Sequence, residues 1–311
     1  MPKTERTLRL GTRASTLALA QSGMIARKLE RLHPGLNVEM VQISTTGDRV
    51  TNKALKDFGG AGVFVKELES ALLDGRIDLA VHSLKDMPTR QPRGLVIGAV
   101  AGREDPRDCA VVKGGVLLED LKPGSVIGSG SLRRRAQLKI AFPQLEFAEI
   151  RGNIDTRIRK VHDGEFAGTI LARAGLKRAK LLSRATETLP LSLMLPAPGQ
   201  GALGLECRLK DRTTLRLIKP LHNAQAAACV NAERALLQAL GGGCHLPLGA
   251  LAVVRNGKLT LRAFLGLPDG SASCTAEEAG AVSRPEALGK KIAAAMMELG
   301  AREILKQLEK S

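Results

Sequence analysis

Hydrophobic and polar positions alternate between two periods along the first hundred residues. Short apolar runs predict strands, and apolar positions repeated every three or four residues predict helices. The predicted strands are 8–11, 38–43, 77–82 and 95–100, and the predicted helices are 17–32, capped by Ser15 or Thr16, and 64–73. This strand–helix alternation is typical of a mainly parallel sheet. The polar, glycine-rich residues 44–62 between them predict a long loop.

The same pattern continues after a turn-rich segment at 102–106, and we expect three α/β units joined by hinges. The further predicted strands are 109–112, 126–127, 145–150, 168–172, 248–254, 259–267 and 271–276. The further predicted helices are 131–142, 154–162, 223–240 and one running from 284 or 285 to about 308. Three prolines punctuate residues 189–206, which predicts a connection between lobes.

Composition adds a strong excess of base. The chain has 311 residues, 47 Lys and Arg against 31 Asp and Glu, and a net charge of +16. This charge indicates an anionic partner, which could be nucleic acid, a membrane surface or a small acidic substrate. Six Phe with no Tyr or Trp leave few platforms for stacking bases, so single-stranded nucleic acid is disfavoured.

The amino-terminal residues and the spacing of the cysteines indicate a reducing compartment. The amino terminus has no apolar core, and no apolar run is long enough to span a bilayer. The five cysteines contain no CxxC pair and no zinc spacing, so we expect free thiols, no metal and a cytoplasmic location.

The basic turn GSGSLRRRAQL at 128–138 is a candidate anion pocket. A strand enters a Gly/Ser turn and then a helix that carries Ser131, Arg133 and Arg134 near its start. Free N–H groups, hydroxyls and guanidinium groups together would bind an anion. The alternative is a capped helix with a solvated basic face.

Two further basic segments follow predicted strands. Arg151 and Arg157 lie in EIRGNIDTRIRKV, and Arg13 and Ser15 follow the first strand in an equivalent position. Residues at the carboxyl ends of parallel strands face the crevice where α/β proteins bind ligands. We therefore expect one anionic ligand shared by two lobes. The alternative for Arg151 is a surface ion pair with a neighbouring acid.

The segment DLAVHSLKDMPT at 78–89 places Lys85 and Asp86 directly after a buried strand. Cations nearby would keep Asp86 ionised, which makes it an acceptor for polarised N–H groups or a stabiliser of positive charge. The alternative is a Lys85–Asp86 surface turn. His82 is expected to be a hydrogen-bonded core histidine.

A helix expected to end near residue 240 is followed by GGGC, which displays Cys244 on a loop. Cys244 could be a nucleophile, a covalent tether or a buried structural cysteine. A catalytic pair with His245 is disfavoured, because adjacent residues rarely aim their side chains at one point.

Taken in order, these segments resemble the porphobilinogen deaminase family over nearly the whole chain. The matching motifs also include LGTRASTLALAQ, GVFVKELE, EDPRD, LARAGLKR and LPAPGQGALGLE. The resemblance implies three domains: two periplasmic-binding-protein-like lobes of type II and a small α/β domain carrying the cysteine. The expected boundaries are 1–101 with 201–219, 102–200 with a hinge near 194–200, and 220–311.

The resemblance also implies the chemistry. Cys244 would form a thioether to a dipyrromethane cofactor, on which four porphobilinogen molecules are joined head to tail with loss of ammonia. The product, linear hydroxymethylbilane, serves tetrapyrrole and heme biosynthesis. Asp86 matches the catalytic aspartate, with Lys85 beside it, and would stabilise a cationic azafulvene.

Residues expected to hold carboxylates of cofactor or substrate follow from the same resemblance. For the cofactor they are Ser131, Arg133, Arg134, Lys85 and Asp86, and for the substrate Arg13, Ser15, Arg151, Arg157, Arg178 and Gln200. Ala61 departs from the family, which often has Lys there. The family further implies a monomer with no nucleic-acid or membrane partner.

Two other functions compete with this interpretation. A two-lobed carboxylate sensor or carrier would explain arginines at strand ends, but it leaves the GGGC loop unexplained and usually needs export. A nucleic-acid binder would explain the charge, but its bases should be segregated from acids or joined by aromatics.

Overall fold

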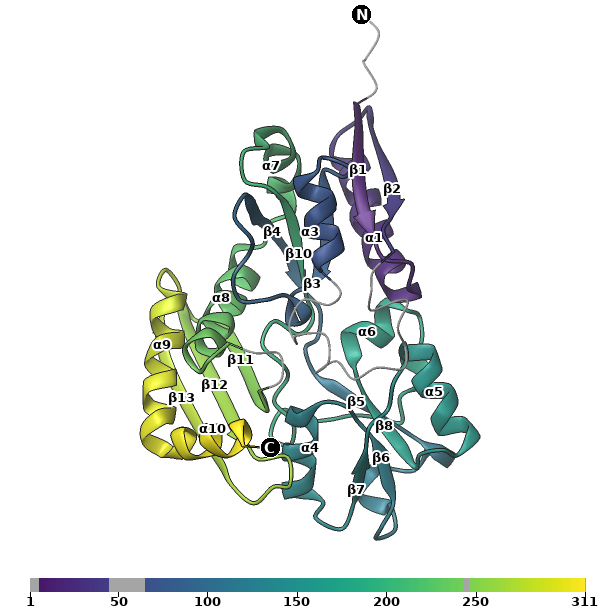
Figure 1. Cartoon of the computed structure of the whole chain (residues 1–311), viewed down its shortest axis with the longest axis vertical. Coiled ribbons are helices and arrows are strands. Elements are labelled where there is room, and N and C mark those ends of the chain that lie inside the picture. The colour runs from purple at the N-terminus through teal and green to yellow at the C-terminus, as the bar shows by residue number, and fades with distance from the viewer. Residues whose placement is uncertain (1–5, 45–64, 243–245, 311) are drawn as a thin grey trace, which may run out of the picture. The chain divides into compact units, whose positions relative to one another are not determined.

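The computed structural model describes residues 6–44, 65–242 and 246–310 (Figure 1). The chain divides into two compact units, residues 1–103 with 202–227 and residues 104–201 with 228–311. Mixed α/β architecture confirms the predicted fold class. The expected limits of the three domains stay a prediction.

The first unit is built on a five-stranded sheet. Its strands are β1 (Arg6–Thr12), β2 (Leu36–Gln42), β3 (Leu79–Ser83), β4 (Leu95–Arg103) and β10 (Ala202–Arg208). Their order is β2-β1-β3-β10-β4. β1 is parallel to β2 and β3, whereas β10 runs antiparallel to β3 and β4. The predicted parallel core is therefore correct for three strands, and β10 is the exception.

Helices cover both faces of this sheet, because successive residues of a strand point to opposite sides. The helices are α1 (Thr16–Leu32), α3 (Lys66–Leu73) and α7 (Arg212–Ile218). Leu79 and Val81 pack with α1 and α7 in one apolar cluster, while Ala80 between them packs with α3 in another. Ser15 caps α1 as predicted, since its Oγ accepts a hydrogen bond from the Ala18 N–H.

Residues 189–206, predicted as a connection between lobes, end in a strand that the prediction did not include. Ala202–Arg208 forms β10, the strand between β3 and β4. Gly204 suits this position because a Cβ there would come within 2.5 Å of Leu84 Cδ2. Small residues and glycines resemble a loop in sequence, but here they let a strand pass close beneath a neighbouring turn.

The second unit contains a sheet with the same topology. Its strands are β5 (Asp108–Val112), β6 (Val126–Gly128), β7 (Glu146–Ala148), β8 (Gly168–Ala172) and β9 (Glu187–Thr188). Their order is β7-β6-β8-β5-β9, with β6 parallel to β7 and β8 and with β5 antiparallel to β8 and β9. The two sheets thus have the same strand order. In each, the second parallel strand lies at one edge, followed by the first and third parallel strands, the antiparallel strand and a last strand. This repeated topology agrees with the predicted two-lobed fold.

Helices α4 (Leu132–Ala141), α5 (Ile154–Asp163) and α6 (Arg173–Arg178) flank this second sheet. Alternate residues of β5 again divide the core. Ala110 and Val112 pack with Leu138 of α4, whereas Cys109 and Val111 pack on the side of α5 and α6. The predicted helices at 131–142 and 154–162 are therefore confirmed, each to within one or two residues of its predicted ends.

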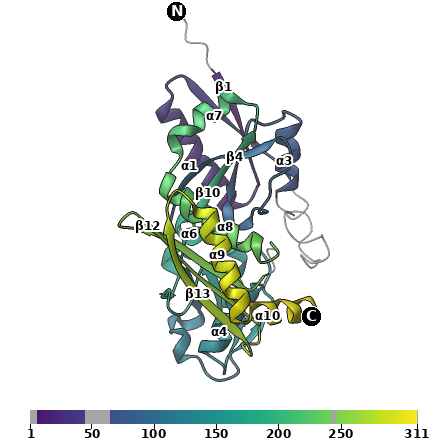
Figure 2. The ribbon, with the colours of Figure 1, turned by 90° about the vertical axis from the view of Figure 1, so that its left-hand side faces the viewer.

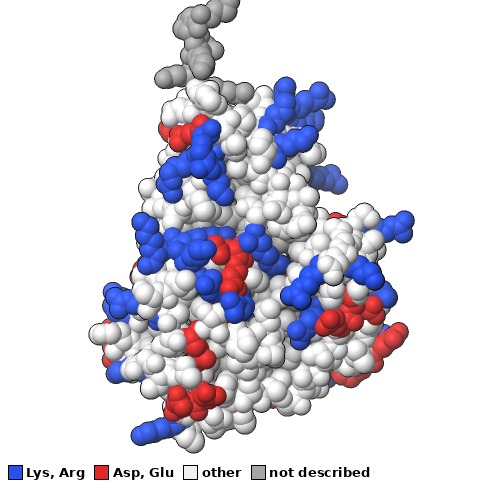
Figure 3. Space-filling model, turned by 180° about the vertical axis from the view of Figure 1, so that it is seen from behind, with Lys and Arg blue, Asp and Glu red and all other residues white. Residues whose placement is uncertain are grey.

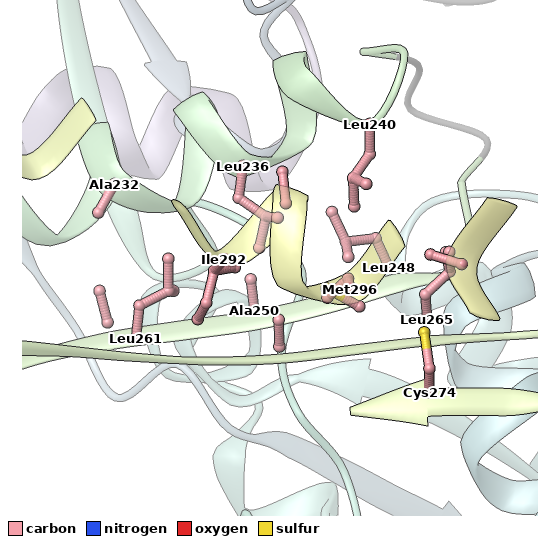
Figure 4. Packing of buried hydrophobic residues seen from close by; sticks show 14 of the residues in the cluster. Ala232, Leu236, Leu240, Leu248, Ala250, Leu261, Leu265, Cys274, Ile292 and Met296 are labelled. Atoms are coloured by element: carbon pink, nitrogen blue, oxygen red, sulfur yellow. The ribbon is translucent and has the colours of Figure 1, made fainter. Parts of the chain in front are cut away.

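A third, antiparallel sheet completes the second unit (Figure 2). It comprises β11 (Leu248–Arg255), β12 (Lys258–Gly266) and β13 (Ser273–Ala281), with α8 (Ala224–Ala239), α9 (Pro285–Met296) and α10 (Arg302–Glu309). Figure 4 shows Leu236 of α8 and Leu240, the residue that follows α8, packing with Ile292 and Met296 of α9 over this sheet. The predicted single last helix is interrupted by a π-helical turn, Met297–Ala301, in which Gly300 has a φ of 102°.

Candidate active site

Residues singled out from the sequence gather at the carboxyl edge of each sheet. In the first unit, Arg13 and Ser15 follow β1, and Lys85 and Asp86 follow its parallel neighbour β3. In the second unit, Ser131 follows β6 and Arg151 follows β7. Parallel strands end at one edge of a sheet, which is where ligands of open α/β sheets bind. Ser15 and Ser131 both cap the helix after the first parallel strand of their sheet. The predicted equivalence of Arg13 and Ser15 with Arg151 is wrong, because Arg151 follows β7, which corresponds to β2 and not to β1.

The turn after β3 presents Asp86 to solvent. Leu84–Asp86 form a single 3-10 turn in which Leu84 is buried, Lys85 half-buried and Asp86 exposed. Within the described residues, no hydrogen bond or ion pair engages the Asp86 carboxylate. Behind the turn, Gln21 Nε2 donates to Ser83 Oγ at 3.0 Å and joins α1 to the end of β3. A buried leucine thus anchors the turn while its carboxylate stays accessible.

A buried acid–base cluster lies beneath that turn. His82 Nε2 donates to Glu206 Oε2 of β10 at 3.0 Å, and both side chains are buried. The prediction that His82 is a hydrogen-bonded core histidine is confirmed. Burial raises the pKa of the nearby Glu69, and the negative charge of Glu206 raises it further. Glu206 was not predicted as a functional residue, although a carboxylate within the apolar run ALGLECR was a visible signal.

Asp108 is the centre of the second unit's site. It is fully buried at the start of β5, paired in register with Ala172 at the end of β8. Its Oδ1 accepts hydrogen bonds from Arg134 Nη2 at 2.7 Å and from Gln200 Nε2 at 3.0 Å. Its Oδ2 lies 2.8 Å from Arg133 Nη1. One carboxylate therefore brings together three residues that the sequence analysis assigned to ligand binding.

Arg133 and Arg134 are only 4% and 7% exposed, so the alternative of a solvated basic face is wrong for both. Arg133 Nη1 also donates to the backbone oxygen of Leu195 at 2.7 Å. Burial lowers the pKa of Arg133, and the charge of Asp108 opposes that shift. Ser131 caps α4, its Oγ accepting from the Arg134 N–H at 3.5 Å.

The remaining predicted arginines have local partners. Arg151 Nη2 lies 2.6 Å from Glu149 Oε1, the ion pair weighed as an alternative. Arg157 Nε donates to the Gly152 oxygen at 2.8 Å. Arg178 Nη2 donates to the Gly201 oxygen at 2.6 Å, and burial lowers its pKa. These contacts leave the predicted substrate contacts of all three arginines untested.

Gln200 is 1% exposed, and its amide nitrogen donates to Pro106 O at 2.6 Å as well as to Asp108. An amide nitrogen carries two hydrogens, so both are used inside the chain. Cys244 and Ala61 lie outside the described residues.

The net charge of the cluster around Asp108 determines which ligands this site can bind. Two guanidinium groups on one carboxylate leave a net positive charge in a buried place. In addition, the buried Arg134 Nε has no hydrogen-bond partner within the described part of the chain. A buried unsatisfied donor is costly, and a carboxylate ligand would satisfy it. The donor set therefore fits a ligand that bears carboxylates.

Comparison with known families decides the identity. The model described as "Porphobilinogen deaminase, dipyromethane cofactor binding domain" matches residues 8–216, and "Porphobilinogen deaminase, C-terminal domain" matches residues 227–298. The chain belongs to the porphobilinogen deaminase family. It is accordingly a transferase of tetrapyrrole biosynthesis whose cofactor is dipyrromethane. The net positive cluster around Asp108 fits a cofactor that bears carboxylates.

Relatives named porphobilinogen deaminase cover almost the whole chain. Those of Syntrophotalea carbinolica and Chromobacterium violaceum are each 47% identical, over 97% and 95% of this chain and 96% of each relative. That of Nitrosomonas europaea is 45% identical over 96% of this chain and 97% of its own length.

Charged groups elsewhere on the surface are mixed. On the face shown in Figure 3, Asp and Glu lie among the Lys and Arg groups in several places. Two ion pairs illustrate this mixing, Lys177 with Glu104 at 2.8 Å and Lys291 with Glu278 at 2.7 Å. In the described residues, no helix combines the length and apolar character that a membrane span requires.

Proposed function

We propose that the residues at the two sheet edges carry out the family's reaction, in which four porphobilinogen molecules are joined head to tail. Each addition releases ammonia, and the product is linear hydroxymethylbilane. The observation that best supports these residue roles is the buried, net positive cluster of Arg133, Arg134 and Asp108. Porphobilinogen carries an acetate and a propionate, so every ring of the growing chain brings two carboxylates that need cationic partners.

Ser131, Arg133 and Arg134 would hold carboxylates of the cofactor, and Cys244 would bear it through a thioether. When bound, dipyrromethane supplies the pyrrole end to which the first substrate is joined. We assign the substrate carboxylates to Arg13, Ser15, Arg151, Arg157 and Arg178. Guanidinium groups suit this work because each presents several donors in a planar fork.

Asp86 would act on the reacting pyrroles. Its carboxylate is exposed on a turn anchored by the buried Leu84, so it can accept hydrogen bonds from pyrrole N–H groups. As ammonia leaves porphobilinogen, positive charge develops on the ring, and a fixed carboxylate nearby stabilises it. Lys85, the next residue back on the same turn, would bind an approaching carboxylate. The Asp86 carboxylate would also bind the cofactor by accepting hydrogen bonds from the pyrrole N–H groups of the cofactor.

Intact-mass measurement of the purified protein tests the attachment. We expect an adduct of two pyrrole units on the wild-type chain and none on Cys244→Ser. An active wild-type enzyme without an adduct would refute the assignment. A carboxylate sensor or a nucleic-acid binder predicts no adduct in either protein.

A second experiment tests Asp86. Asp86→Asn should keep the adduct and lose turnover by about 100-fold or more, the usual scale for a group that acts in the transition state. Asp74→Asn, which changes an exposed carboxylate of the same unit, is the matched control and should retain turnover. Near-normal product formation by Asp86→Asn would contradict the assigned role.

Location and assembly stay predictions from the sequence. We infer a cytoplasmic monomer with no nucleic-acid partner from the cysteine usage and the family resemblance. Light scattering coupled to size-exclusion chromatography tests the monomer, and a dimer mass would contradict it.

A further inference from the structure

Asp108 is the last residue of the EDPRD motif, but the proposed reaction gives it no role. It contacts no solvent, yet its two oxygens meet side chains from α4 and from the segment before β10. Its backbone is held as firmly, because its carbonyl oxygen accepts from the Leu189 N–H at 2.9 Å and its strand pairs with β8. The carboxylate is thus a rigid point to which other groups are tied.

We propose that Asp108 is the positioning residue that sets Arg133 and Arg134 for the carboxylates of the cofactor. The inference rests on the proposed function of these two arginines. Long side chains lose rotamer freedom when they bind, and that cost falls if a buried partner has already fixed them. The Asp108 carboxylate fixes both arginines through their Nη atoms, at 2.8 Å for Arg133 and 2.7 Å for Arg134. The Arg134 Nε, which has no hydrogen-bond partner within the described residues, is left to bind a ligand.

Gln200 extends the same arrangement. Its amide donates to Asp108 Oδ1 and to Pro106 O, so it ties the carboxylate to the segment before β10. Gln200 is then a second positioning residue that acts through Asp108. Its predicted contact with substrate is not needed for this role.

Electrostatics and geometry predict opposite results for Asp108→Asn, which makes the substitution informative. Removing a negative charge raises the net positive charge of the cluster, so charge alone predicts tighter binding of an anionic cofactor. Loss of the carboxylate also frees two guanidinium groups from their fixed orientation, which predicts weaker binding. The proposal requires that the loss of the fixed guanidinium orientation outweighs the gain in positive charge.

The experiment compares adduct occupancy by intact mass and KM for porphobilinogen in folded, monodisperse protein. For Asp108→Asn we expect most chains to lack the adduct, and the loaded chains to show a KM raised about ten-fold or more. Asp105→Asn is the charge-matched control, since Asp105 pairs with Arg107 and Arg173 nearby but does not contact the cluster. It should load fully.

A second pair of variants keeps the test decisive if Asp108→Asn does not fold. Gln200→Leu removes a hydrogen bond to Asp108 without changing charge and should lower occupancy. Thr169→Val removes another buried, uncharged hydrogen bond of the same unit, from Thr169 Oγ1 to the Gly128 oxygen at 2.8 Å, and should not lower occupancy.

The outcomes separate the inference from the proposed function. An adduct on the wild type with equal occupancy and KM in Asp108→Asn, or in Gln200→Leu where that variant is the one that folds, overturns the positioning role alone. Absence of the adduct from the wild type overturns the proposed function. Lower thermal stability with full loading shows a merely structural carboxylate and also overturns the inference.

Discussion

His82 on β3 and Glu206 on β10 form a buried hydrogen-bonded pair, with Nε2 and Oε2 3.0 Å apart. The pair crosses the two antiparallel strands directly behind the turn that carries Lys85 and Asp86. Because neither side chain reaches water, each depends on the other to satisfy its polar atoms.

Replacing Glu206 by Ala should destabilise the protein by about 1–3 kcal/mol, the cost of leaving a buried polar group without its hydrogen-bond partner. Urea unfolding followed by circular dichroism measures this, since the chain has no Trp or Tyr for fluorescence. The control is Glu278→Gln, which breaks a surface pair with Lys291 and should cost about 0–1 kcal/mol. Equal costs for the two variants would contradict the role of the buried pair.

Asp78 should contribute stability that depends on pH. Burial alone would raise its pKa, but hydrogen bonds from Arg9 and Arg208 outweigh burial and hold the pKa below its usual value. A carboxyl with a lowered folded pKa stabilises fully above its ordinary pKa of about 3.9, and the effect is lost as pH falls through the folded value.

Asp78→Asn should therefore cost about 1 kcal/mol at pH 7. The difference from wild type should shrink below about pH 3.9. Urea midpoints measured between pH 7 and pH 3 check this, with the exposed Asp74→Asn as control. A difference that stays constant down to pH 3 would be evidence against the ion pair.

Three buried cysteines, Cys109, Cys207 and Cys274, should be unreactive in the native state. Burial raises the pKa of Cys207 to about 11 and also raises the pKa values of Cys109 and Cys274. Only the thiolate reacts with alkylating reagents, so about one Cys207 in a thousand is reactive at pH 8 even before access is considered. Iodoacetamide labelling with peptide mapping should find these three sites protected until urea unfolds the chain. Native labelling of Cys207 at the unfolded rate is the contrary result.

Gly289 on α9 should not tolerate a methyl group. A Cβ there would meet the backbone of α8, with Ala232 O closest and Leu236 N at 2.8 Å. Although Gly→Ala stabilises an exposed helix by up to about 1 kcal/mol, overpacking here should cost about 1–3 kcal/mol. Thermal unfolding of Gly289→Ala compared with Lys290→Ala, at the exposed neighbouring position, tests this. A raised melting temperature for Gly289→Ala would mean that the helices can separate freely.

Local patterns were sufficient for most single elements. Ser15 followed by apolar residues at helical spacing predicted α1, and the apolar run before His82 predicted β3 to within two residues. They failed where a distant neighbour decides the structure. β10 has the small residues of a loop and becomes a strand only because β3 and β4 lie on both sides of it. Likewise, Gly300 interrupts the last helix after Met296, although the residues around it follow a helical pattern.

For the site, the sequence by itself determined the family, the cysteine loop and the set of basic residues at strand ends, because these are properties of consecutive residues. It could not identify the carboxylates that organise them. Asp108 stands 25 positions before Arg133, and Glu206 stands 124 positions after His82. Only the tertiary structure pairs them, because burial removes water as an alternative partner and leaves each charge dependent on a residue from another strand or helix.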